Sequence, residues 1–155
     1  MLNHIGLTQL GNGDTKSGIK ALKGFWGSIG IDTVGMFLHD GSGLSRYNAI
    51  TTKQLVDILC YMKNTENAEP FYHSLAIAGE TGTLEEIFTA APLRGNIKAK
   101  TGSMKRVASL TGYVTNISGD DIAFSLIVNN YDGNVSKLKV TEAIEKLLVA
   151  LVNEP

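Results

Sequence analysis

The sequence has few of the residues that build metal centres and disulfide bonds. It contains one cysteine, Cys60, and three histidines, none of them spaced as a pair of metal ligands. A single cysteine excludes a disulfide within the chain, and the scattered histidines predict that there is no metal site. Cys60 lies among apolar residues at helical spacing, so we expect it to be a buried, unreactive thiol.

Charge of one sign and long hydrophobic runs are also scarce. Charged residues are 19% of the 155 residues, and the formal net charge is -1. Such a surface does not attract a polyanion, so nucleic acid is not an expected partner. No apolar run approaches the length of a membrane span, and the N-terminus lacks the basic start and apolar core of a signal peptide. The sequence also lacks a glycine-rich phosphate-binding loop, and no cofactor is expected.

Hydrophobic residues, in contrast, make up 43% of the chain. This share and the chain length predict one compact domain over residues 1–155, with no repeat or linker to divide it. Apolar residues three or four positions apart predict several helices. They are expected at residues 17–30, 51–63, 71–78, 84–88 and 140–151.

Polar residues at the expected helix starts are candidate caps. Ser17, one of the threonines at positions 51 and 52, and Ser136 have the hydroxyl that an N-cap needs. Thr83 followed by Glu86 fits a capping box. Trp26 lies on the apolar face of the first of these helices, so we expect it in the core.

The remaining apolar segments favour strands. A short strand is expected at residues 33–38, a strand, turn and return strand at 97–113 with the turn at 104–106, and a further strand at 122–128. Short turns join the last three strands, which predicts an antiparallel meander. The last helix should cover one face of it. The expected fold class is therefore α/β of the α+β type, an antiparallel sheet with packed helices.

The first of these strands ends in a triplet with chemical potential, Lys100-Thr101-Gly102. A strand that offers an ammonium, a hydroxyl and a residue without a side chain can hold an anionic peptide end. Its backbone can meanwhile pair with an extended ligand. A Lys-Thr-Gly triplet, together with S-x-x-K and S-D-N motifs, is typical of serine acyl-transfer sites that use a lysine.

Three segments in order make the pattern more specific. They are DGSGLSRYN at residues 40–48, AGETGTLEEIF at 78–88 and KAKTGS at 98–103. From about residue 17 to its end, the chain resembles the C-terminal part of the penicillin-binding D-alanyl-D-alanine carboxypeptidase/endopeptidase family, low-molecular-mass class C (serine peptidase family S13). The resemblance implies the C-terminal part of a penicillin-binding/β-lactamase-like transpeptidase domain.

The resemblance also implies roles for residues of the second motif. Ser45 would be the hydroxyl that relays protons near the leaving group. Asn48 would be the motif's asparagine, although the family's usual spacing points to the position of Tyr47.

The third motif would supply the cation and the ligand-binding groups. Lys100 would hold Ser45 and the nucleophile in register, and Thr101 and Ser103 would receive the terminal carboxylate of the substrate. The backbone N–H of Ser103 would form half of the oxyanion hole. Gly102 would let the acyl chain approach closely.

The nucleophile of the family belongs to an S-x-x-K motif, and neither match in this sequence fits well. Ser136 with Lys139 comes after the third motif, and Ser17 with Lys20 stands only 28 residues before Ser45. We therefore expect a C-terminal fragment that lacks the N-terminal S-x-x-K segment and is inactive alone. We also expect exposed apolar surface that would meet the missing N-terminal part or support self-association.

The function implied is that of a serine-type D-Ala-D-Ala carboxypeptidase or endopeptidase. Its partners would be peptidoglycan stem peptides and β-lactams, in a periplasmic or exported setting. Two alternatives remain open: a non-catalytic module that binds peptidoglycan or β-lactams, and a β-lactamase-like hydrolase.

Overall fold

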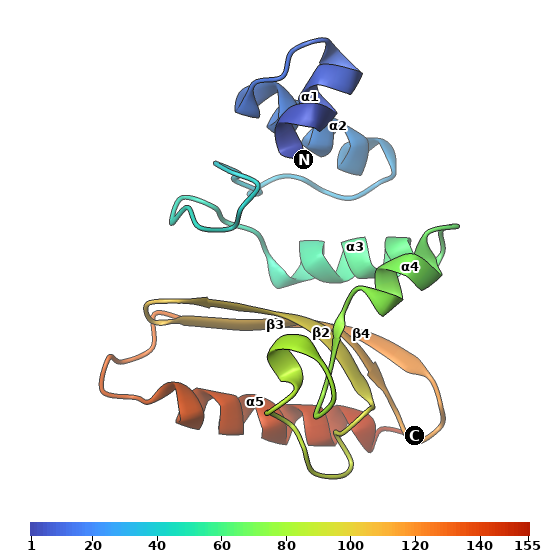
Figure 1. Cartoon of the computed structure of the whole chain (residues 1–155), viewed down its shortest axis with the longest axis vertical. Coiled ribbons are helices and arrows are strands. Elements are labelled where there is room, and N and C mark those ends of the chain that lie inside the picture. Colours follow the sequence, from blue (N-terminus) through green and yellow to red (C-terminus); the bar gives the residue numbers. More distant parts are fainter. The chain divides into compact units, whose positions relative to one another are not determined.

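The computed structural model describes all residues, 1–155, and divides into two compact units, Met1–Asp57 and Ile58–Pro155. Figure 1 shows the helices and strands of the two units. The elements in chain order are α1 (Leu2–Leu10), α2 (Thr15–Ser28), α3 (Thr52–Lys63), α4 (Ala68–His73), β1 (Ala76–Ile77), the 3-10 helix η1 (Gly82–Leu84), β2 (Ile97–Met104), β3 (Val107–Thr115), β4 (Asp121–Asn129) and α5 (Lys137–Val152).

The first unit begins with two helices that touch through glycines. A Cβ on Gly18 would collide with the backbone of Leu2, so only glycine allows this approach. The sequence pattern predicted α2 but not α1. The prediction that Ser17 caps α2 was wrong: the cap is Asp14, whose carboxylate accepts a hydrogen bond from the Ser17 N–H at 2.6 Å. Trp26 is half-buried rather than a core residue.

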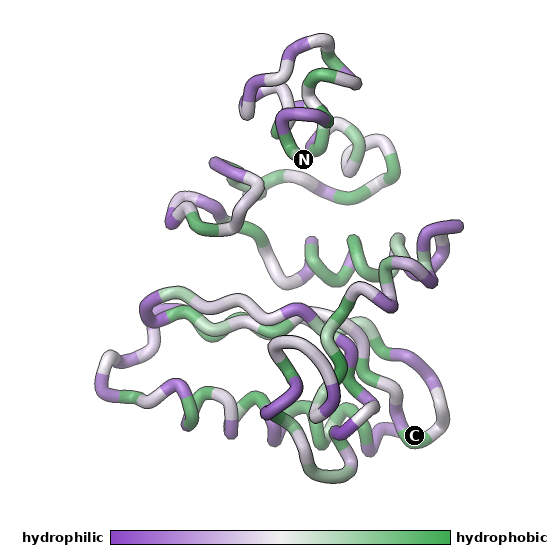
Figure 2. The backbone as a smooth tube through the Cα atoms, in the orientation of Figure 1, coloured by the Kyte–Doolittle hydropathy of each residue, from purple (hydrophilic) through white to green (hydrophobic).

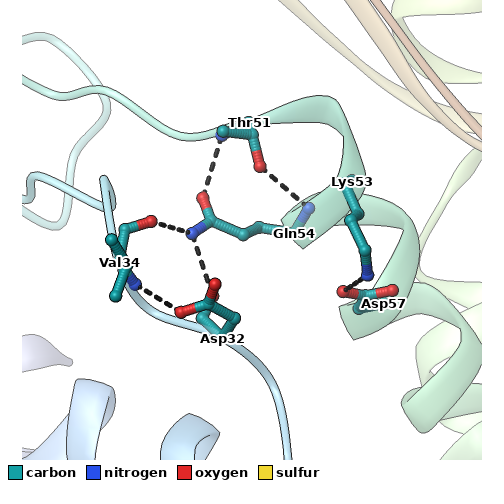
Figure 3. Close-up of polar contacts among 6 residues, drawn as sticks. All are labelled: Asp32, Val34, Thr51, Lys53, Gln54 and Asp57. Carbon is teal, nitrogen blue, oxygen red and sulfur yellow. Dashed lines mark hydrogen bonds and ion pairs between the residues drawn. The ribbon is translucent and has the colours of Figure 1, made fainter.

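The strand expected at residues 33–38 is not formed, apart from a single bridge between Phe37 and Ala49. The side chain of Gln54 takes the place of a partner strand, since its amide nitrogen donates to the carbonyls of Asp32 and Val34 at 2.9 Å each (Figure 3). The predicted helix at 51–63 is confirmed as α3. Its cap is reciprocal, with Gln54 N–H donating to the Thr51 hydroxyl and Thr51 N–H donating to the Gln54 side chain.

The second unit is built on an antiparallel sheet with strand order β1-β2-β3-β4. The predicted meander is confirmed, and α5 lies along one face of the sheet (Figure 1). Apolar and polar residues alternate along α5 (Figure 2), and its buried side chains join those of β2 and β3 in one core. Ser136 caps α5, as predicted, by accepting from Lys139 N–H at 3.3 Å.

Two predicted helices of this unit differ from the structure. The helix expected at 71–78 ends at His73, and the chain then forms β1. The helical turn expected at 84–88 is instead η1, which ends at Leu84, so Thr83 and Glu86 form no capping box. The carbonyls of Leu84 and Ile87 both accept a hydrogen bond from the Gly79 N–H, and the chain does not continue as a helix.

The buried thiol predicted for Cys60 was also wrong, because Cys60 is exposed. Its neighbour Leu59 takes the core position instead, 4% exposed. Successive helical residues point in different directions, so only one of the two can face the core. The Leu59 carbonyl accepts from the Tyr113 hydroxyl at 2.7 Å, and burial raises the pKa of Tyr113 to about 12.

Candidate active site

The strand β2 has a free outer edge along its second half. On one side it pairs with β3 from Ile97 to Met104. On the other side it pairs with β1 only at Ala99 and Lys98. Within this unit, residues 100–104 therefore leave their outward N–H and C=O groups without a partner strand. Such an edge accepts an added strand through main-chain hydrogen bonds.

Lys100 stands at the start of this free edge and is exposed. Its ammonium donates one hydrogen bond, to the Thr101 carbonyl at 2.7 Å, and an ammonium has three donors. Lys98, two residues earlier on the same face, is engaged differently: its nitrogen lies 4.0 Å from the ring centre of Tyr72. Of the two lysines on this strand, Lys100 is thus the one whose ammonium is available to bind a ligand at the edge.

Thr101, Gly102 and Ser103 complete the edge. Side chains alternate along a strand, so Thr101 and Ser103 share the face opposite to Lys100. The Thr101 hydroxyl donates to the Thr83 hydroxyl at 3.0 Å, while Ser103 is exposed. A Cβ on Gly102 would collide with the hydroxyl of Ser109 on β3. The missing side chain therefore leaves room for the Ser109 hydroxyl on this face of the sheet.

A cavity of about 250 Å³ lies beside these residues. Its wall consists of residues from β2, β3, α5, η1 and the segment that follows η1. The lining residues are Thr83, Ile87, Phe88, Thr101, Gly102, Ser103, Ala108, Ser109, Leu110, Lys137, Thr141 and Ile144. Apolar side chains and hydroxyls thus meet in it, with one cation, Lys137.

Ser45 and Asn48 belong to the first unit, in a loop organised by Asp40. The Asp40 carboxylate accepts from the N–H of Gly43 at 2.9 Å and of Ser45 at 3.0 Å. It also accepts from the Asn48 amide at 2.9 Å and from the Ser42 hydroxyl at 3.1 Å. These bonds, led by that from Asn48, hold the pKa of the Asp40 carboxyl below its usual value.

The two polar side chains of this loop differ in what they leave available. The Ser45 hydroxyl accepts from Tyr47 N–H at 3.2 Å and keeps its own proton to donate. The Asn48 oxygen accepts from the N–H groups of His39 at 2.6 Å and Asp40 at 3.3 Å. Asn48 is therefore used mainly to close its own loop.

The structure brings the predicted site residues into two groups. One is the pair Ser45 and Asn48 in the first unit, and the other is the run Lys100 to Ser103 in the second. Sequence reasoning missed Asp40 and Thr83. For Asp40 the available signal was Asp-Gly-Ser-Gly, since an aspartate before small residues often accepts from the turn that follows. For Thr83 no local pattern signals a partner 18 residues away.

The structure contains no group of three or more metal-binding side chains. None of its helices has both the length and the hydropathy required to span a membrane.

Comparison with known proteins identifies a family that matches the chain. Residues 1–151 match the model of the D-Ala-D-Ala carboxypeptidase 3 (S13) family. The chain is 35% identical over 149 residues to the D-alanyl-D-alanine carboxypeptidase of Actinomadura sp. (strain R39), covering 93% of the chain and 27% of that protein. It is 36% identical over 116 residues to the D-alanyl-D-alanine carboxypeptidase DacB of Haemophilus influenzae, covering 74% of the chain and 24% of DacB.

The chain also resembles a solved structure. Penicillin binding protein 4 (dacB) from Haemophilus influenzae, complexed with a β-lactam, superposes with a TM-score of 0.91 at 28% identity, over 99% of this chain and 37% of that one. This chain thus spans about a quarter of the curated relatives and about a third of the solved one. By its sequence and its fold, the chain belongs to the D-Ala-D-Ala carboxypeptidase 3 (S13) family.

Proposed function

We propose that this chain is part of a serine-type D-Ala-D-Ala carboxypeptidase or endopeptidase that acts on peptidoglycan stem peptides through an acyl-enzyme. The observation that carries the proposal is the free edge of β2 with Lys100, Thr101, Gly102 and Ser103 on it. Support comes from membership of the S13 family and from relatives that are D-alanyl-D-alanine carboxypeptidases.

The stem peptide adds to this edge as an extended strand. Lys100 supplies the positive charge that stabilises anionic states of the reacting groups. The hydroxyls of Thr101 and Ser103 receive the terminal carboxylate of the peptide, and the Ser103 N–H is half of the oxyanion hole. Gly102 leaves room for the acyl chain beside the strand.

Ser45 is the proton-relaying hydroxyl of the proposal, since it keeps a proton to donate. Asn48 contributes by closing the loop that carries Ser45, in agreement with its bonds to His39 and Asp40. Neither S-x-x-K serine is the proposed nucleophile. Ser17 stands only 28 residues before Ser45, and Ser136 follows the third motif and is occupied as the cap of α5. This chain therefore supplies the strand but not the acylated serine, and is inactive alone.

The proposal includes the ligands and setting of such an enzyme. β-lactams bind at the same edge, which is supported by the related penicillin binding protein 4, solved in complex with a β-lactam, and the enzyme works outside the cytoplasmic membrane. Exposed apolar side chains, among them Val34, Phe37 and Leu44, are covered in the working enzyme by self-association or by a further part of the same protein.

Titration of the ¹⁵N-labelled chain with a short peptide that ends in D-Ala-D-Ala tests the proposal. The amides of residues 100–104 should shift, because the peptide pairs with their backbone, and the peptide ending in L-Ala-L-Ala should have little effect. Lys100→Ala should weaken binding. Lys98→Ala is the matched control and should not, because the Lys98 ammonium rests on Tyr72. If the amides of this strand are unaffected, the proposed function is wrong.

A further inference from the structure

We propose that Thr83 is a further carboxylate-binding residue of this site, which works as a pair with Thr101. The inference rests on the proposed function and adds to it a side chain from outside the third motif. The observation behind it is the contact between the two hydroxyls, 3.0 Å apart, in which Thr101 donates and Thr83 accepts. Both residues line the cavity beside the free edge of β2.

The structure holds Thr83 firmly in this position. The next residue, Leu84, is fully buried in the core of the unit, and its carbonyl accepts from Gly79 N–H at 2.9 Å. On the other side, the Thr81 hydroxyl accepts from Ile77 N–H on β1 at 2.9 Å. Thr83 itself is exposed, so a ligand at the edge can reach its hydroxyl without displacing the core.

The direction of the hydrogen bond determines which hydroxyl can serve a carboxylate. A threonine hydroxyl has one proton and two acceptor lone pairs. Since Thr101 gives its proton to Thr83, Thr101 supports the carboxylate through Thr83 while this bond lasts, and it donates to the carboxylate directly only when its hydroxyl turns. Thr83 accepts that proton and keeps its own for donation. The pair therefore offers one outward O–H, and it belongs to Thr83.

The surroundings favour an anion at this point. Lys137, at the start of α5, is the charged residue that lines the same cavity, and no acidic side chain lines it. A hydroxyl that donates to a carboxylate makes a charge-assisted hydrogen bond, which is stronger than one between neutral groups. Thr83 should therefore contribute to the preference for a free carboxylate over a carboxamide at the end of the peptide.

Binding of two peptides by variants of the whole chain tests this inference. One peptide ends in D-Ala-D-Ala with a free carboxylate, and the other is its C-terminal amide. Thr83→Val should weaken binding of the acid by roughly tenfold, the scale of a lost hydrogen bond to a charged group, and should change binding of the amide much less. Thr83→Ser keeps the hydroxyl and should bind both peptides like the natural chain.

Thr141→Val is the matched control, because Thr141 lines the same cavity but donates to the Lys137 carbonyl instead of to Thr101. It should leave the ratio of acid to amide affinity unchanged. An unchanged ratio in Thr83→Val, or an equal loss in Thr141→Val, would overturn the role of Thr83 while the natural chain still binds the acid. If the natural chain binds neither peptide, the proposed function fails and this inference fails with it.

Discussion

At the scale of single residues, Asp40 organises the loop that carries Ser45 through its hydrogen bonds. Its carboxylate accepts four hydrogen bonds, and the bond from Asn48 contributes most to lowering the pKa of this carboxyl below its ordinary value. A carboxyl whose folded pKa is lowered stabilises the folded loop above its ordinary pKa, and this contribution is lost as the pH falls through the folded value. The loop should therefore keep its structure from neutral pH down to the ordinary pKa of an aspartate carboxyl. It should open in stronger acid, where Asp40 becomes protonated.

Substitution of Asp40 by asparagine should open the same loop at neutral pH, since the new side chain has one carbonyl oxygen where the carboxylate had two. The amide resonances of Gly43 and Ser45, both of which donate to Asp40, should move toward random-coil positions. Asp132→Asn changes a carboxylate of the second unit, which accepts from Asn134 N–H, and should have no such effect. Native Gly43 and Ser45 resonances in Asp40→Asn would contradict this prediction.

At the scale of elements, the start of α3 is coupled to the chain before it through one side chain, Gln54. This side chain is 4% exposed and makes three hydrogen bonds, to Thr51, Asp32 and Val34. The strand predicted at residues 33–38 is interrupted by a turn at Val34 and Gly35, where Gly35 has a positive φ. The carbonyls of Asp32 and Val34 pair with the Gln54 side chain rather than with a strand. A short apolar run in the sequence does not distinguish the two outcomes, since each satisfies the same backbone groups.

Gln54→Leu should destabilise the first unit by about 1–3 kcal/mol, because it leaves carbonyls that are turned toward Gln54 without a donor. Urea unfolding followed by Trp26 fluorescence measures this change. The control is Lys53→Ala, which removes an exposed ion pair with Asp57 that contributes at most about 1 kcal/mol (Figure 3). Equal midpoints for Gln54→Leu and the natural chain would show that these hydrogen bonds contribute nothing.

For the molecule as a whole, the two units differ in how much core they contain. The second unit has a continuous core of buried apolar residues from the sheet, η1 and α5. In the first unit, Ile31 and Met36 are the buried apolar side chains. Since burial of apolar surface is the main favourable term in folding, the first unit should be the less stable of the two.

Unfolding in urea should therefore not be two-state. The single tryptophan, Trp26, lies in the first unit, so its fluorescence should change at a lower urea concentration than the far-UV circular dichroism, which is averaged over both units. Coincident transitions by the two probes would show instead that the units unfold together.

Local patterns in the sequence determined the elements whose stability is local. Helical spacing and caps were sufficient for α3 and α5, and alternating strands joined by short turns were sufficient for the meander of β2, β3 and β4. The Lys-Thr-Gly triplet was placed on β2 for the same reason. Tertiary structure decided the rest, because it depends on partners distant in the chain. β1 stops pairing at Ala99 and so frees the edge of β2, Thr83 meets Thr101 across 18 residues, and Leu59 rather than Cys60 faces the core.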